Sequence, residues 1–410
     1  MEKALRRVTA GIAILLLFPS FCYNNYDKYG SYDNYDKNRI EEILSLLNEE
    51  MLFNYTQAIV SFGPRVTGSD ACYNCAKYIH EKFLSFGLDS TIYNWSVSSG
   101  LRKYNGQNVE GVLPGDEKII IFNAHFDSVE NTVGADDNAA GVASLIAVAE
   151  VMSKFRFNHT VKFVAFSGEE NGLLGSNEYA RNSYEKDDFI IVEMNADMIA
   201  HANGENGSKF RIYATEDADW IVEKIKEINK NFLSFELIIG NINRKFGGSD
   251  YLSFAKYGFE SIAFFEYEWN PYMHQPEDDL SNVNFSYLLK TTRLIAGAIA
   301  CTADAEIEKP YFSIISPRRG GIYFNGEKVY ELRNEKLFAL GKIFLSLSLK
   351  NEAEKIKVYL DNKIIHVFNF PPYEMEISFP SFGKHELKLI AYNKNKFSTD
   401  WIEFYWLNLF

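Results

Sequence analysis

The chain has 410 residues, 47% of them hydrophobic and 24% charged, a composition typical of globular proteins. This length exceeds one typical domain and is sufficient to bury a large core. The formal net charge of -13 argues against a nucleic-acid partner, because phosphate binding depends on clustered lysine and arginine.

The start of the chain has the features of an export sequence. Positive residues precede an apolar run that is short for a membrane-spanning helix: Lys3, Arg6 and Arg7, then Val8 to Phe18. We therefore predict that residues 1–22 are a signal peptide or an N-terminal membrane anchor. The folded part would then be extracellular, or membrane-anchored and facing outside. Cys22 leaves lipid attachment open, although the bulky Phe21 before it disfavours that modification.

A tract rich in tyrosine, asparagine and aspartate follows at residues 23–38, where we predict a flexible linker. Apolar residues then recur at helical spacing from Ile40 to Leu47 and from Ala71 to Phe86. Cys72 and Cys75 belong to the second of these helices. They form either a local disulfide or two buried thiols, and the sequence leaves both alternatives open.

Strand-like and helix-like segments alternate through the middle of the chain. The strand-like runs are largely continuous in apolar residues: Lys118–Phe122, Val161–Phe166, Phe189–Met194 and Ser261–Phe265. The helix-like segments are Gly141–Lys154, Leu173–Arg181, Trp220–Ile228, Asp250–Lys256 and Leu288–Ala303. This order predicts an α/β domain over residues 39–305, a mostly parallel open sheet with helices on both faces.

Short strand-like runs separated by turn residues occupy the last part of the chain. They are Tyr311–Ile315, Ile343–Leu349, Lys355–Leu360, Ile364–Phe368, Met375–Phe379, His385–Tyr392 and Ile402–Leu407. We predict an antiparallel β-sandwich over residues 309–410. The segments Val358–Asp361, Pro371–Tyr373 and Gly383–His385 resemble an immunoglobulin-like accessory domain, which would take no part in the chemistry.

Histidines and carboxylates follow the ends of the four strand-like runs of the α/β domain. The residues are His125, the Glu169-Glu170 pair, Asp197 and His274, with Asp137 between the first two strands. Ligands bind beyond the carboxyl ends of the strands in an open α/β sheet, so these side chains should meet at one edge. Zinc accepts imidazole and carboxylate ligands, and a carboxylate can bridge two ions. The sequence therefore predicts a two-metal hydrolase.

Five motifs in the same region resemble those of the co-catalytic dizinc aminopeptidase family, the bacterial leucyl-aminopeptidase-like zinc exopeptidases. They are Asn123–Ser128 (NAHFDS), Gly134–Gly141 (GADDNAAG), Ser167–Ser176 (SGEENGLLGS), Asn195–Met198 (NADM) and His274–Asp278 (HQPED). One such motif would be weak, but five in register are specific, and the resemblance spans roughly residues 55 to 300. It implies a zinc exopeptidase fold, peptide substrates and two Zn²⁺ ions per chain.

The resemblance also implies how the metal ligands are shared. Asp137 would bridge the two zinc ions. His125 and Asp197 would complete one metal site, and Glu170 and His274 would complete the other. Each ion then has three protein ligands and keeps a position for a shared water.

Two further carboxylates take catalytic roles by the same resemblance. Glu169 would be the general base that accepts the proton of the attacking water. Asp127 would orient the imidazole of His125. The family also has a cis peptide bond after its bridging aspartate, here between Asp137 and Asn138.

Two departures from the family pattern affect substrate recognition. Met273 stands where some members have the tyrosine that stabilises the oxyanion, and Tyr272 is one residue earlier. Gly248 stands where some members have an arginine before the Ser-Asp pair. The oxyanion donor and the recognition of the substrate terminus therefore stay open.

Several functions are compatible with these residues. Aminopeptidase activity is the first expectation, and a carboxypeptidase or dipeptidase on the same two-zinc site is the alternative. A glutaminyl cyclase uses a single zinc and lacks the first histidine, so His125 disfavours it. Receptor-like peptidase domains lose metal ligands, and here each ligand position is filled.

Overall fold

The computed structural model describes residues 35–99, 102–242, 248–332 and 335–409. The predicted export segment 1–22 and most of the predicted linker lie outside these residues. Helix α1 (Lys37–Leu46) begins inside the range expected as linker, because the Asp36 carboxylate accepts the backbone N–H groups of Asn38 and Arg39. Among the described residues, none of the helices combines the length and the apolar character that a membrane crossing requires.

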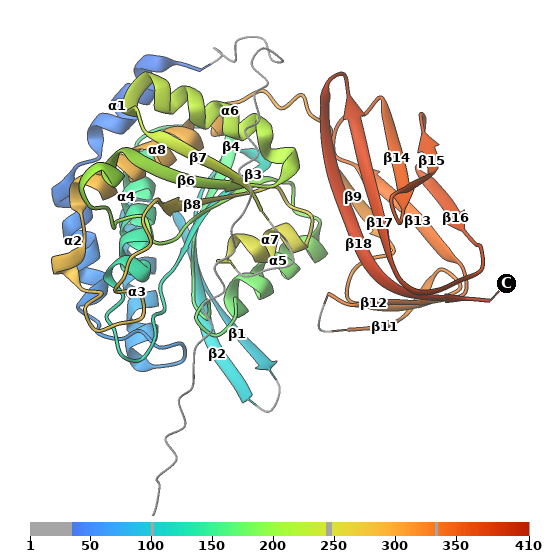
Figure 1. Ribbon diagram of the computed structural model, residues 1–410, viewed down its shortest axis with the longest axis horizontal. Helices are drawn as coiled ribbons and strands as arrows, with labels where there is room; N and C mark the ends of the chain where they lie inside the picture. Colours follow the sequence, from blue (N-terminus) through green and yellow to red (C-terminus); the bar gives the residue numbers. More distant parts are fainter. Residues whose placement is uncertain (1–34, 100–101, 243–247, 333–334, 410) are drawn as a thin grey trace, which may run out of the picture. The chain divides into compact units, whose positions relative to one another are not determined.

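An eight-stranded sheet forms the centre of the α/β part, in the order β1-β2-β4-β3-β5-β8-β6-β7 (Figure 1). Its strands are β1 (Asp89–Ser99), β2 (Arg102–Leu113), β3 (Asp116–His125), β4 (His159–Phe166), β5 (Ile190–Ala196), β6 (Lys209–Ala214), β7 (Glu236–Asn241) and β8 (Ser261–Glu266). The four central strands, β4, β3, β5 and β8, run parallel to one another. β1 pairs with β2, β2 with β4 and β6 with β8 in the antiparallel sense. The predicted mostly parallel α/β sheet is confirmed.

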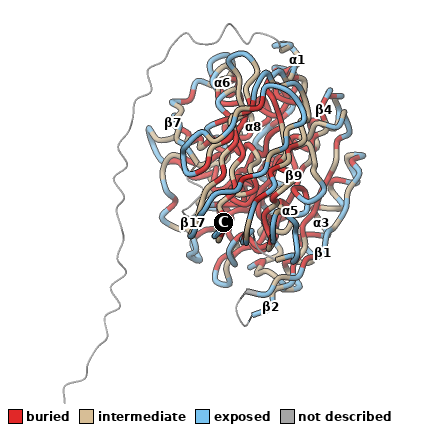
Figure 2. Tube along the Cα trace, turned by 90° about the vertical axis from the view of Figure 1, so that its right-hand side faces the viewer, coloured by how far each residue is buried: buried red, intermediate tan, exposed pale blue. Residues whose placement is uncertain are grey.

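Helices cover both faces of this sheet, as predicted. They are α2 (Glu49–Val60), α3 (Asp70–Ser85), α4 (Gly141–Met152), α5 (Leu174–Lys186), α6 (Asp219–Ile228), α7 (Tyr251–Lys256) and α8 (Phe285–Ala303). Ile120 and Phe122 of β3 belong to the core that includes α4 and α8, whereas Ile121 packs in a separate cluster with residues of α5 and α7. Buried positions gather around these central elements (Figure 2). Because alternate residues of a strand point to opposite faces, β3 is covered twice.

The structure distinguishes between the disulfide and the free-thiol alternatives for the two cysteines of helix α3. Cys72 and Cys75 are both free thiols and both buried. Burial raises the pKa of Cys75 to about 12, so this thiol stays protonated at neutral pH. The alternative of two buried thiols therefore describes this structure.

Two further sheets pack face to face in the last part of the chain, which confirms the predicted β-sandwich. One sheet has the order β11-β10-β12-β18-β17-β14-β15 and the other β16-β13-β9. The strands are β9 (Phe312–Ser316), β10 (Gly321–Phe324), β11 (Glu327–Glu331), β12 (Leu337–Leu340), β13 (Ile343–Leu349), β14 (Lys355–Leu360), β15 (Lys363–Phe368), β16 (Glu374–Ile377), β17 (Ser381–Asn393) and β18 (Lys396–Asn408). Leu389 and Phe404 of the larger sheet share one core with Leu345 of the smaller sheet.

The sandwich differs from the prediction in its pairing and its strand number. β12 lies parallel to both β10 and β18, so the larger sheet is mixed, and the predicted antiparallel pairing holds for the other strand pairs of the sandwich but not for β12. β10, β11 and β12 were not predicted. Asn325 and Gly326, at φ 48° and 88°, form the tight turn of the β10–β11 hairpin, where both positions need a left-handed backbone.

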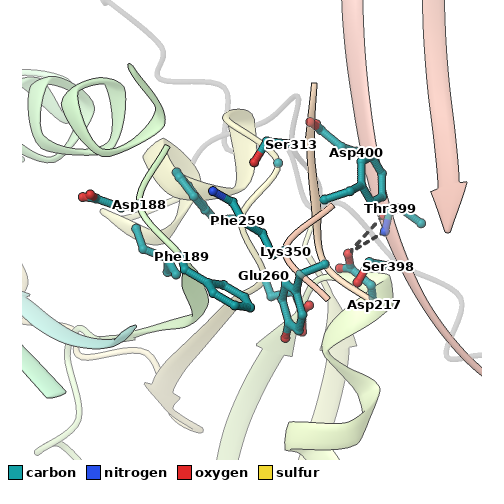
Figure 3. Close-up of a pocket in the computed structure, with 14 residues that line it drawn as sticks. Asp188, Phe189, Asp217, Phe259, Glu260, Ser313, Lys350, Ser398, Thr399 and Asp400 are labelled. Atoms are coloured by element: carbon teal, nitrogen blue, oxygen red, sulfur yellow. Dashed lines mark hydrogen bonds between the residues drawn. The ribbon is translucent and has the colours of Figure 1, made fainter. Parts of the chain in front are cut away.

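Buried polar contacts join the sandwich to the α/β part. Lys309 forms an ion pair with Glu260, and both side chains are at most 4% exposed. The backbone N–H and the hydroxyl of Thr399 donate to Asp217 Oδ2 at 3.1 and 3.2 Å. A cavity of about 50 Å³ lies at this junction, with Asp217, Glu260 and Thr399 in its lining (Figure 3). Its lining includes none of the predicted metal ligands.

Candidate metal centre

The five predicted metal ligands converge at the ends of the central strands. Nε2 of His125 lies 3.3 Å from Oδ1 of Asp137 and 3.3 Å from Oδ1 of Asp197. Nε2 of His274 lies 3.2 Å from Oδ2 of Asp137 and 3.1 Å from Oε2 of Glu170. The two oxygens of Asp137 therefore face different histidines. This arrangement gives two groups of three donors that share one carboxylate.

The sheet explains why these residues meet. His125 is the last residue of β3, Glu170 lies in the turn after β4, and Asp197 directly follows β5. Asp137 lies in the turn η1 (Ala135–Ala140), and His274 lies in the loop after β8. Since β3, β4, β5 and β8 are parallel neighbours, their carboxyl ends share one edge, as the sequence predicted.

Glycine is required where the chain enters η1. Gly134 has a φ of 53°, and a Cβ at this position would lie 2.1 Å from the carbonyl oxygen of Asp137. A larger residue would displace the turn that presents Asp137. The peptide bond between Asp137 and Asn138 is cis, as the family resemblance implied. The Asn138 amide donates to the carbonyl oxygen of Ala196 at 2.9 Å, which ties η1 to the end of β5.

The centre is buried on one side and open on the other. His125 is 1% exposed and Asp137 4%, whereas the side chain of His274 is 41% exposed. A substrate can therefore approach from the side of His274. Burial and the charge of Asp137 raise the pKa of Glu170 to about 7.

The imidazoles balance the charge of the carboxylates. Burial acts to raise the pKa of Asp137, but hydrogen bonds from His125 and His274 hold it below its ordinary value. Burial acts to lower the pKa of His125, but the charges of Asp197 and Glu169 hold it well above its ordinary value. The cluster thus favours positive charge between its carboxylates, the place where a cation would bind.

The donor set fits zinc. Each group offers one imidazole and two carboxylates, with ligand atoms within 4.8 Å of one another. Oε1 of Glu170 is buried and has no hydrogen-bond partner among the described residues. A buried carboxylate oxygen without a partner is costly, and a bound cation would satisfy it. His125, Asp137 and Asp197 would hold one ion, and Asp137, Glu170 and His274 the other.

Asp127 links the first histidine to the glutamate pair. Oδ1 of Asp127 lies 3.6 Å from Nδ1 of His125, and the carbonyl oxygen of Asp127 is nearer, at 3.2 Å. The carboxylate also accepts the backbone N–H groups of Glu169 at 3.3 Å and Glu170 at 3.4 Å. Asp127 is fully buried, and its carbonyl oxygen accepts the hydrogen bond that orients the imidazole of His125.

Glu169 lies in a tight turn between β4 and α5. Its carbonyl oxygen accepts the N–H groups of Gly172 at 2.8 Å and Leu173 at 3.0 Å. The turn begins at Gly168, whose φ of 83° favours glycine and whose Cβ would lie 2.8 Å from the Trp95 ring. Burial and the nearby charge of Asp197 raise the pKa of Glu169 well above its ordinary value, although the charge of His125 opposes this. Glu169 is thus a carboxylate beside the metal ligands, as a general base must be.

The sequence did not assign a role to several residues that support the centre. The Asp278 carboxylate, which is fully buried, accepts the backbone N–H of Asp136 at 2.8 Å and of Asp137 at 3.1 Å. Asp278 ends the HQPED motif, and its place four residues after His274 was the available signal. Asp250 is also fully buried, and its pKa is raised to about 7 by burial, with the charges of Asp127 and Asp197 adding to the effect.

Tyr272, the open candidate for oxyanion donor, has contacts outside the ligand cluster. Its backbone N–H donates to Oδ1 of Asn270 at 2.9 Å, and its ring lies edge-on to the ring of His201, 6.5 Å between centroids. The amide of Asn270 in turn donates to Asp136 Oδ2 at 2.8 Å. The loop after β8 is thereby fixed to η1, and the identity of the oxyanion donor stays a prediction.

Comparison with known proteins identifies the same region. Residues 108–299 match the family model described as "Peptidase family M28". The chain is 23% identical over 275 residues to a probable leucine aminopeptidase of Arthroderma otae, covering 63% of this chain and 73% of that protein. It is 30% identical over 237 residues to aminopeptidase Y of Saccharomyces cerevisiae, covering 54% of this chain and 43% of that protein. It therefore spans less than half of the yeast relative.

Solved structures show the same fold. An aminopeptidase from Aneurinibacillus sp. strain AM-1 superimposes with a TM-score of 0.57 at 18% identity, covering 65% of this chain and 97% of that one. A glutaminyl cyclase from Fimbriiglobus ruber gives 0.53 at 17% identity, covering 62% and 95%. The zinc exopeptidase fold expected from the motifs is confirmed. The chain is therefore a metallopeptidase with the fold of the zinc aminopeptidases, and its residues 108–299 match peptidase family M28.

Proposed function

We propose that the chain is an aminopeptidase that holds two zinc ions and removes N-terminal residues from peptides. The observation that carries the proposal is the shared carboxylate. The two oxygens of Asp137 lie 3.3 and 3.2 Å from the imidazoles of His125 and His274, each of which has a second carboxylate beside it. A single-zinc site would leave one of these groups without a cation. The names of the curated relatives, leucine aminopeptidase and aminopeptidase Y, support the same activity.

The residues divide the reaction between them. Bound zinc supplies a Lewis acid for the scissile carbonyl and makes a bound water more acidic. Glu169, raised in pKa and beside the ligands, accepts the proton of the attacking water and returns it to the leaving amine. Asp127 holds the His125 ring and the backbone of the glutamate pair in register.

The alternatives differ in substrate end or in metal number. A carboxypeptidase or dipeptidase would use the same two groups of ligands, and the missing arginine at Gly248 leaves recognition of the terminus undecided. A glutaminyl cyclase shares the fold, but as a single-zinc enzyme it would use one of the two donor groups of this site and leave the other without an ion. The two-zinc peptidase is therefore the better fit to this site.

The direct test combines metal analysis with substrates that differ at their ends. We expect about two zinc ions per chain, activity lost with a chelator and restored by zinc, and cleavage of aminoacyl chromogens. A matched substrate with an acetylated N-terminus should not be cleaved. Cleavage of peptides from the carboxyl end instead would favour the carboxypeptidase. One zinc ion with cyclisation of N-terminal glutamine would favour the cyclase.

Export and accessory roles belong to the same proposal. The charged and then apolar start of the chain supports export, with the enzyme outside the cytoplasm or anchored there by residues 1–22. An immunoglobulin-like role for the sandwich, as an anchoring or orienting module, is likewise proposed from its strands alone. Cell fractionation of the full-length chain is the appropriate measurement, and a cytosolic enzyme that retains residues 1–22 would contradict export.

A further inference from the structure

The turn between α2 and α3 contacts the metal centre from outside the residues that match the family. Thr67, in this turn, donates its hydroxyl to Oδ2 of Asp127 at 2.7 Å. This contact is shorter than those that the same carboxylate makes with the backbone of Glu169 and Glu170, at 3.3 and 3.4 Å. Thr67 is therefore the strongest hydrogen-bond partner of Asp127 among these contacts.

The contact fixes the direction of the Asp127 carboxylate. With Oδ2 held by Thr67, Oδ1 faces Nδ1 of His125, 3.6 Å away, and accepts the N–H of Glu169. Without the hydroxyl, the carboxylate would keep only the longer contacts and could turn about its Cβ–Cγ bond. Its orientation matters because it lies between a ligand of one metal group and the backbone of the general base.

Arg65, in the same turn, holds the two segments that carry His125 and Asp137. Its side chain is fully buried. Nε donates to the carbonyl oxygen of Phe126 at 2.7 Å, Nη1 to that of Val133 at 2.5 Å, and Nη2 to that of Gly134 at 3.2 Å. Phe126 directly follows His125, and Gly134 enters η1. A planar guanidinium can span these carbonyls with fixed spacing, which a lysine cannot do.

We propose that Thr67 and Arg65 are positioning residues of the metal centre, with Arg65 setting the spacing between the β3 end and η1 and Thr67 setting the orientation of Asp127. The proposal rests on the proposed two-zinc function. It extends the site to residues before position 108, where the family match begins. Partners of metal ligands typically change metal affinity by roughly 10- to 100-fold when removed.

The test compares Thr67→Val, which removes the hydroxyl at nearly constant volume, with Thr67→Ser, which keeps it. Thr302→Val is the matched control, since Thr302 is fully buried and donates its hydroxyl to the carbonyl oxygen of Ala298 at 2.7 Å in α8. Zinc affinity is measured by chelator competition, the site geometry by the absorption of the cobalt-loaded protein, and the metal-free stability by thermal unfolding. None of these readouts needs a substrate, so a failure of the proposed aminopeptidase activity is seen separately.

We expect Thr67→Val to bind zinc about tenfold more weakly, with a shifted cobalt spectrum, and Thr67→Ser to restore both. Thr302→Val should leave both at the wild-type values. Wild-type zinc affinity and spectrum in Thr67→Val would overturn the proposal for Thr67. Failure of Thr67→Ser to restore the zinc affinity and the spectrum would overturn it as well. So would an equal loss of zinc affinity in Thr302→Val, because the Thr67 hydroxyl would then act only on the stability of the fold.

Arg65→Lys tests the second residue. The variant keeps the charge but offers one nitrogen in place of the fork, so we expect zinc affinity to fall at least tenfold in the folded protein. A folded Arg65→Lys protein with wild-type zinc affinity would remove Arg65 from the proposal. If Arg65→Lys does not fold, the Thr67 variants alone decide whether the turn between α2 and α3 positions the metal centre.

Discussion

Buried carboxylates are stabilised differently at the sandwich junction and at the metal centre. At the junction, Glu260 pairs with Lys309, and Asp400 pairs with Arg319 at 3.1 Å. At the metal centre, imidazoles are the cationic groups beside the carboxylates. Over residues 35–99, 102–242, 248–332 and 335–409, no lysine or arginine forms an ion pair with Asp137, Glu170 or Asp197.

The difference separates a structural role from a functional one. A buried carboxylate is tolerated when a cation and further hydrogen bonds satisfy it. At the junction the chain supplies that cation itself, and Glu260 also accepts the indole N–H of Trp220 at 2.8 Å. At the metal centre the carboxylates share two histidines, and Oε1 of Glu170 has no hydrogen-bond partner within the part of the chain that the structure describes. The second arrangement fits a cation bound from outside the chain.

Glu193 is a buried carboxyl group that is accommodated in a third way, by keeping its proton. Glu193 in β5 is fully buried and receives a hydrogen bond from the amide of Asn123. Burial raises its pKa to about 8, so at neutral pH the group keeps its proton. The chain therefore compensates the desolvation of buried carboxylates in three ways. It pairs them with a lysine or arginine, it groups them where an external cation can bind, or it keeps them protonated.

Replacement of the shared carboxylate is the strongest test of the metal-centre side of this comparison. We expect Asp137→Ala to lose both zinc ions and with them all metal-dependent activity, because its oxygens face both histidines. His274→Ala should weaken one ion chiefly, since His274 belongs to one donor group. Elemental analysis of the purified variants gives the zinc content. A full complement of two zinc ions in Asp137→Ala would show that the carboxylate bridges nothing.

Replacement of the base should separate catalysis from metal binding. We expect Glu169→Gln to keep its zinc and its fold but to lower kcat by at least ~10², the scale of a lost general base. Steady-state kinetics with an aminoacyl chromogen measures the change, and zinc content is measured in the same samples. Glu117→Gln, at a side chain that is 75% exposed, serves as the control and should match the wild type. Equal kcat in both variants would remove Glu169 from the mechanism.

The sequence predicted the parts of the fold and site that depend on local pattern. The apolar runs of β3, β4, β5 and β8 were evident because both faces of these strands are buried. The parallel order then determines that residues after these strands meet at one edge. This is why the ligand set could be predicted before any distance was known.

Elements whose stability depends on distant neighbours were missed. β7 is half-exposed along its length, so its residues lack the continuous apolar run of the central strands. β12 has four residues and gains its place only by pairing with β10 and β18. Thr67 and Arg65 contact the centre across 60 and 61 positions of sequence, and no local pattern marks such a contact.

The junction side of the comparison is tested by removing its cation. Lys309→Met leaves Glu260 buried with the Trp220 indole and no cation, so we expect a loss of about 3 kcal/mol in the free energy of unfolding. Burial raises the pKa of Glu260 to about 7 although Lys309 opposes this, so the measurement belongs at pH 8, where the wild-type carboxylate is charged and pairs with the lysine. Denaturant unfolding of zinc-loaded protein gives the free energy.

Lys396→Met provides the matched control for the junction. Lys396 pairs with Glu308, whose side chain is 51% exposed, and exposed pairs contribute at most about 1 kcal/mol. Zinc content should be unchanged in both variants, because neither lysine belongs to the metal centre. Equal stability of Lys309→Met and Lys396→Met would show that the buried Lys309–Glu260 ion pair does not stabilise the fold more than an exposed pair does.

The proton-bearing carboxylate gives the clearest dependence on pH. The pKa of Glu193 is about 8 in the folded protein, above the ordinary value of 4.5, so the folded state holds a proton that the unfolded state has lost between these values. Its contribution to stability is therefore complete below the ordinary pKa and is lost as pH rises toward 8. One proton gives a slope of at most about 1.4 kcal/mol per pH unit.

Glu193→Gln should remove this contribution, since an amide does not titrate. We expect the stability difference between wild type and variant, measured by denaturant unfolding of zinc-loaded protein from pH 5 to pH 8, to shift steadily in favour of the variant as pH rises. Glu117→Gln, on the surface, should show no such trend. Taking the difference cancels the titration of the other buried carboxylates, which both proteins share. A difference that stays constant with pH would mean that Glu193 is ionised in the folded protein. The chain would then have to stabilise that charge with hydrogen bonds alone, and protonation would no longer count as a third way of accommodating a buried carboxylate.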